Sequence, residues 1–223
     1  MFCTFLKNLL LSPLLIIATG LNFFSIFLLV KEHSLSSSSA WFLAGFLAGL
    51  ITFKFLCRFE VVYVFGHEMA HWLAAKICCK KTGKFSFGFK SGSVEVEKPN
   101  TFIMLAPYFF PTLTVVLLPL YFLLPLLKHQ DQATILFTFL IGSSFAHHIY
   151  MNARLIIKTK QSDFDKPGHF FSATLLAFIN SFIVFGIFVF FTSSFGNLGI
   201  FIQACTTVFH KVSSILKWYS DKL

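Results

Sequence analysis

Long hydrophobic segments alternate with short polar connections along most of this chain. Six segments carry almost only apolar side chains, at residues 9–30, 40–57, 61–77, 101–127, 133–157 and 169–191. A helix needs about 20 mostly apolar residues to cross a bilayer, and most of these segments approach or exceed that length. The pattern predicts an all-α polytopic membrane protein with about six transmembrane helices.

The apolar pattern is interrupted at two places. Arg58 and Glu60 interrupt the hydrophobic residues between positions 40 and 77, which favours two helices that meet near Arg58 over one long broken helix. The 101–127 segment contains four prolines, which remove backbone hydrogen bonds and predict kinks or partial unwinding. Irregular backbone is tolerated at membrane depth only where it faces protein or water, so this segment fits the wall of a hydrated site.

A different period marks the polar stretch that follows residue 77. Apolar and polar residues alternate from Phe85 to Phe89 and again from Val94 to Glu97, with Ser91-Gly92 between them. Alternation with a period of two predicts a short β-hairpin with one apolar face at the membrane interface. A sharper interpretation is an edge strand that pairs with an extended substrate peptide.

Composition and charge support membrane embedding. Of the 223 residues, 56% are hydrophobic and only 12% are charged, compared with about 25% charged residues in typical soluble domains. The longest polar stretch, residues 79–100, is too short to form a core of its own. We therefore expect one membrane-embedded domain over residues 1–223, with its core at about 60–190.

The net charge of +9 is explained by loop lysines and not by nucleic acid, which we do not expect as a partner. Lysines gather in the 78–100 and 154–168 connections, which the positive-inside rule places on the cytoplasmic side. The residues after Ser194 mix apolar and basic side chains and predict a C-terminal amphipathic helix that lies on the lipid bilayer.

The chemistry-bearing motif is His67-Glu68-Met69-Ala70-His71, within an apolar segment. Residues four apart share one face of a helix, so His67 and His71 can hold one metal ion together. Glu68 then lies beside the metal, where it can accept a proton from a bound water. Two histidines and a glutamate are costly in lipid unless they have a function.

A catalytic zinc usually has three protein ligands, so a third must come from elsewhere. Eliminating the other carboxylates leaves Asp163 and Asp165, which precede a membrane helix on the same side as the end of the histidine helix. His147 and His148, in the middle of a membrane helix, compete with them. His169 is a further candidate.

The residues Phe65 to Ala75, in which the HExxH motif is followed by small side chains, resemble the site-2-type intramembrane zinc metalloproteases. In that family the third ligand is an aspartate near one end of a later core helix, and the segment Ser162 to Gly168 stands in that place. Asp163 maps best onto the ligand, with Asp165 as the alternative. The hairpin and the Asn100–Pro107 region also resemble family features.

The resemblance implies an intramembrane zinc protease that hydrolyses peptide bonds of a membrane protein or peptide substrate. Its metal ligands would be His67, His71 and Asp163, and Glu68 would be the general base for a zinc-activated water. It also implies a bacterial inner membrane, with the active site open to the cytoplasm.

Two other functions are compatible with the same residues. The histidines and acids could form a metal site in a membrane transporter or sensor, although a transporter predicts internal repeats and this sequence has no evident repeat. A catalytically inactive, protease-like scaffold is the second alternative, and the intact Glu68 argues against it.

Overall fold

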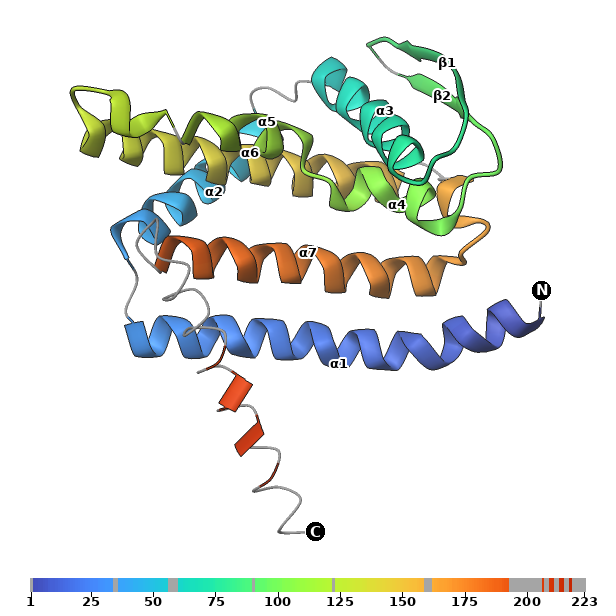
Figure 1. The fold of residues 1–223 in the computed structure, drawn as a ribbon, viewed down its shortest axis with the longest axis horizontal. Helices are drawn as coiled ribbons and strands as arrows, with labels where there is room; N and C mark the ends of the chain where they lie inside the picture. Colours follow the sequence, from blue (N-terminus) through green and yellow to red (C-terminus); the bar gives the residue numbers. More distant parts are fainter. Residues whose placement is uncertain are drawn as a thin grey trace. The chain divides into compact units, whose positions relative to one another are not determined.

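The computed structural model describes residues 2–33, 36–55, 60–89, 91–121, 123–158 and 162–192, with a few isolated positions after residue 205. This part of the chain is mostly helical, with seven α-helices and one small two-stranded sheet (Figure 1). Arg58, and the predicted C-terminal helix apart from the isolated positions, lie outside the described residues.

The fold divides into two compact units, residues 1–40 with 177–223, and residues 41–176. The first contains α1 (Phe2–His33) and most of α7 (His169–Thr192). Within it, the Asn22 amide donates a hydrogen bond of 2.9 Å to the Ser181 hydroxyl. The Ser36 hydroxyl donates one of 3.0 Å to the Phe191 carbonyl.

The second unit contains every residue predicted for the metal site. Its elements follow in the order α2 (Ser37–Phe55, from residue 41 on), α3 (Glu60–Ile77), β1 (Thr82–Phe87), β2 (Gly92–Val96), α4 (Thr101–Phe109), α5 (Thr112–Tyr121), the 3-10 helix η1 (Leu124–Leu126), α6 (Gln130–Lys158), the 3-10 helix η2 (Ser162–Phe164) and the first residues of α7. α3 packs against α4, α5 and both strands, and α5 packs against α6.

Four helices are long and apolar enough to cross a membrane, namely α1, α2, α6 and α7 over Leu10–Leu28, Ser37–Phe55, Gln130–Ile157 and His169–Phe191. α4 and α5 form a bent pair that would be a fifth span. The described residues thus contain four such helices, or five if the bent pair is one span, where about six were predicted. α3 is the helix that does not qualify, because Glu60, Glu68 and Lys76 place three charges in its 18 residues.

Both predicted breaks are present. α2 ends at Phe55 and α3 begins at Glu60, so the 40–77 region forms two helices. α4 and α5 meet at an angle of 65° beside Pro111, whose ring nitrogen cannot continue the helical hydrogen bonds. α4 begins at an N-cap, where the side chain of Asn100 accepts a 2.9 Å hydrogen bond from the Ile103 amide.

The hairpin is also present, with small differences at its turn. β1 and β2 pair antiparallel, with Phe85 opposite Val94 and Phe87 opposite Gly92. Gly92 was expected in the turn but is the first residue of β2. The rings of Phe85 and Phe87 lie 6.1 and 4.9 Å from the ring of Phe65. The apolar face of β1 therefore packs against α3, beside the HExxH motif.

A pair of glycines brings α2 and α6 together. A Cβ atom at Gly142 would lie 2.0 Å from the carbonyl oxygen of Phe42, and one at Gly45 would lie 2.0 Å from that of Phe139. No side chain fits at such distances, so the two backbones touch directly, which is typical of helix packing in membranes.

Candidate metal centre

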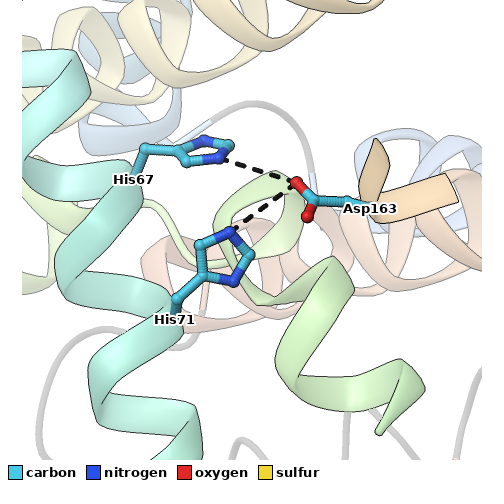
Figure 2. A group of neighbouring side chains, drawn as sticks. All are labelled: His67, His71 and Asp163. Carbon is cyan, nitrogen blue, oxygen red and sulfur yellow. Dashed lines mark ion pairs between the residues drawn. The ribbon is translucent and has the colours of Figure 1, made fainter. Parts of the chain in front are cut away.

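α3 presents the two histidines of the motif on one face. His67 and His71 are one helical turn apart, and their ring centroids are separated by 5.0 Å. Both rings turn toward the same point beside α3 (Figure 2). Their side chains are 10% and 13% exposed, so the site is largely shielded from solvent.

Asp163, in η2, lies at that point. Its Oδ2 atom is 3.8 Å from the Nε2 atom of His67 and 3.6 Å from that of His71 (Figure 2). Across the described residues, these three side chains form the one group of three or more metal-binding side chains whose ligand atoms lie within 4.8 Å of one another.

The three residues fit a zinc ion in chemistry and in spacing. Two imidazole nitrogens and one carboxylate oxygen are typical ligands of catalytic zinc. With bonds of about 2.0–2.1 Å, neighbouring ligands of a tetrahedral site are about 3.4 Å apart. The Asp163 oxygen lies 3.6 and 3.8 Å from the two imidazole nitrogens, and all three ligand atoms lie within 4.8 Å of one another, so an ion between them would draw the side chains inward.

α4 orients the His71 ring. The Nδ1 atom of His71 lies 2.8 Å from the carbonyl oxygen of Ile103. A ring nitrogen that faces a carbonyl carries a proton, which leaves Nε2, the nitrogen that faces Asp163, as the atom that would bind a metal. The Asn100 cap holds the first turn of α4, and through it the carbonyl that orients this ligand.

Tyr108 orients the Asp163 carboxylate. The Tyr108 hydroxyl donates a 2.9 Å hydrogen bond to Oδ2 of Asp163, and its ring packs 4.9 Å from that of Phe164. Burial favours the neutral acid, but interactions with both imidazoles and with Tyr108 outweigh it and hold the pKa of Asp163 well below its usual range. Asp163 therefore carries the negative charge that a metal ligand needs.

We did not predict Tyr108 as a site residue from the sequence. A buried tyrosine hydroxyl normally finds a hydrogen-bond partner, and Tyr108 directly follows Pro107 in an apolar segment, at 1% exposure. The sequence signal is the tyrosine in a proline-rich apolar segment, and the burial that gives it meaning comes from the structure.

Glu68 is buried under the start of β2. Its side chain is part of α3, and the residue is 8% exposed. A Cβ atom placed on Gly92 would lie 2.6 Å from Cγ of Glu68. The close approach of the hairpin to the predicted base is thus possible only because residue 92 has no side chain.

The competing ligand candidates lie outside the group formed by His67, His71 and Asp163. Asp165 is 54% exposed, and its carboxylate is 3.8 Å from the imidazole of His169. His147 and His148 are buried in α6 and, with His67, line a small cavity. None of these four residues belongs to the group formed by His67, His71 and Asp163.

A cleft of about 430 Å³ opens beside the site. His71 and Asp163 form part of its wall, and the remaining lining residues are Val94, Val96, Pro99, Ile103, Met104, Ser162, Asp165 and Lys166. One wall is thus β2 and the other is α4 with the segment before α7. A molecule in this cleft would lie against two of the three candidate ligands, His71 and Asp163.

Comparison of the chain with protein-family models, with curated proteins and with solved structures finds no match. The class of the site is therefore inferred from its residues and their geometry.

Proposed function

We propose that this protein is an intramembrane zinc metalloprotease of the site-2 type, which hydrolyses peptide bonds of membrane-spanning substrates. The observation that carries the proposal is the position of Asp163. A carboxylate from a distant part of the chain lies 3.6 Å from one histidine of an HExxH motif and 3.8 Å from the other. Two histidines, one carboxylate and a neighbouring glutamate form the residue set of a hydrolytic zinc site.

His67, His71 and Asp163 would hold the zinc ion. When bound, zinc would activate a water and polarise a carbonyl oxygen. Glu68 would accept the proton of the attacking water and return it to the leaving amine nitrogen. The low exposure of Glu68 suits this role, because burial raises the pKa of Glu68 toward the range in which a general base works best.

The cleft accounts for how a peptide reaches these groups. A helical amide is shielded by its own hydrogen bonds, so a membrane-spanning substrate must unwind before it can be cleaved. β2 pairs with β1 alone in the described residues, and its Val94 and Val96 line the cleft. An unwound segment could add to the hairpin through backbone hydrogen bonds.

The four candidate spans support an integral membrane location. The lysine-rich connections at residues 78–100, which include the hairpin, and 154–168, before α7, favour a site that opens to the cytoplasm. We propose the bacterial inner membrane on the basis of the resemblance to site-2 proteases.

Metal analysis of the detergent-purified protein is the first test. We expect about one zinc per chain in the wild type and in Asp165→Ala, and its loss in Asp163→Ala. Zinc that is retained in Asp163→Ala but lost in His147→Ala would point to another site and to transport or sensing.

Catalysis is tested separately with Glu68→Gln in proteoliposomes that contain a panel of labelled transmembrane peptides. We expect this variant to keep its zinc and fold but to lose cleavage of any peptide that the wild type cuts. Cleavage near the wild-type rate would refute the role of Glu68. A wild type that binds zinc yet cleaves no peptide would favour the non-enzymatic functions.

A further inference from the structure

The two histidines of the centre are supported unequally by the surrounding protein. The Nδ1 atom of His71 faces the Ile103 carbonyl at 2.8 Å. The Nδ1 atom of His67 is buried and has no hydrogen-bond partner among the described residues. A histidine that binds metal through Nε2 carries its proton on Nδ1, and this N–H group is almost always hydrogen-bonded in metal sites. A buried N–H group without a protein partner therefore indicates that a bound molecule accepts its hydrogen bond.

A small cavity adjoins His67. Its volume is about 20 Å³, and a cavity of about 10–15 Å³ or more can hold one water molecule. Five polar side chains line it besides His67, namely Tyr63, Thr112, Ser144, His147 and His148. A buried water needs two to four polar partners. The Tyr63, Thr112 and Ser144 hydroxyls already donate to other groups, so they would act toward a water only as acceptors.

The far wall of the cavity is held in place by a hydrogen-bond network on α6. The Asn152 amide nitrogen lies 3.1 Å from Nε2 of His148, and it also donates a 3.1 Å hydrogen bond to the Tyr108 carbonyl. The Tyr63 hydroxyl donates a 2.8 Å bond to the amide oxygen of Asn152. His147 is fixed by ring contacts, with centroids 4.8 Å from Phe53 and 6.2 Å from Tyr63.

We propose that the cavity holds one ordered water molecule that accepts the hydrogen of His67 Nδ1 and is itself held by His147 and His148. The proposal rests on the metal centre of the proposed function. It makes the two α6 histidines positioning residues, which act on the metal through the water and through His67. The histidine pair in the middle of α6 thereby acquires a role without being a direct ligand.

Zinc affinity of the full-length protein in detergent, measured by competition with a chromogenic chelator, tests this proposal. His147→Phe and His148→Phe remove the polar wall and fill space near the water, whereas His147→Gln and His148→Gln keep a hydrogen-bonding group. Loss of such outer-shell partners typically lowers metal affinity by about 10–100-fold. We expect a loss of this size in at least one Phe variant, largely restored in the matching Gln variant.

Leu113→Val is the matched control, because Leu113 lines the same cavity but carries no polar group. We expect its zinc affinity to stay at the wild-type value. The visible spectrum of the cobalt-substituted protein provides a second readout, since a reoriented His67 would change the bands in the Phe variants and not in the control.

Several results would overturn the proposal. Wild-type affinity in both Phe variants would do so, as would equal losses in the Phe and Gln variants, which would indicate packing instead of hydrogen bonding. If the Phe variants do not accumulate, an experimental structure of the zinc-loaded wild type decides, and a dry cavity refutes the water. A wild type that binds no zinc would overturn the proposed function itself, and this inference with it.

Discussion

Replacing Gly92 with alanine should impair the predicted base without removing the metal ligands. The new Cβ atom would lie 2.6 Å from Cγ of Glu68, and 3.0 Å from both the Ser86 carbonyl oxygen and Cγ1 of Val64. Non-bonded carbon atoms are most stable about 3.5–4.0 Å apart. The hairpin and the Glu68 side chain must therefore separate by about 1 Å.

The expected loss of cleavage rate follows from the role of Glu68 in the proposed mechanism. A misplacement of about 1 Å in a catalytic group can lower the rate by about 100-fold, which corresponds to about 2.7 kcal/mol of transition-state stabilisation. Because the three atoms nearest to the new Cβ belong to Glu68, Ser86 and Val64 and not to a candidate metal ligand, zinc content should remain at the wild-type value. The assay is the initial rate of cleavage of a transmembrane peptide in proteoliposomes, with zinc measured in the same sample.

Gly88→Ala is the control within the same hairpin. A Cβ atom at Gly88 would meet only the Ser91 carbonyl oxygen, at an ordinary contact distance of 3.5 Å, so its activity should be close to that of the wild type. Wild-type cleavage by Gly92→Ala would refute the reasoning, because it would mean that the hairpin does not constrain Glu68. Equal losses in both variants would show a general effect on the hairpin instead.

Three further predictions follow from single contacts. Tyr108→Phe removes the 2.9 Å hydrogen bond to Asp163 and should weaken zinc binding by about 10-fold in chelator competition; unchanged affinity would contradict the orienting role. Asn100→Ala removes the cap of α4 and should lower the free energy of unfolding by about 1 kcal/mol in denaturant titration; an unchanged midpoint would contradict it. Gly142→Ala should lower the stability by about 1–3 kcal/mol through overpacking in thermal unfolding, whereas Gly186→Ala, whose Cβ would meet nothing within 4 Å, should be neutral or slightly stabilising; similar behaviour of the two would refute the close packing of α2 and α6.

Much of the architecture could be predicted from the sequence, because it depends on local patterns. The period of two between Phe85 and Glu97 predicted the hairpin, and the prolines after residue 101 predicted the break between α4 and α5. Both signals come from neighbouring residues and from backbone chemistry that acts within a few positions. Local hydropathy was less reliable for α3, because the charges that serve the site also lower its apolar character.

The sequence alone placed His67 and His71 on one face, because helical periodicity acts over four residues. It could not decide among Asp163, Asp165, His147 and His148, since each is far from the motif along the chain. The tertiary structure brings Asp163 to within 4 Å of both rings, turns Asp165 toward His169 and places the α6 histidines behind His67.

The roles of Tyr108 and Gly92 likewise depend on the tertiary structure alone. Tyr108 reaches Asp163 because α4 packs against both α3 and η2, and Gly92 matters because β2 crosses directly over Glu68. Contacts between segments that are distant in sequence are set by how whole elements pack, and packing sums over many weak interactions that no local pattern encodes. The sequence therefore determined which residues could do chemistry, and the packing of α3, α4, η2 and the hairpin decided which of them meet.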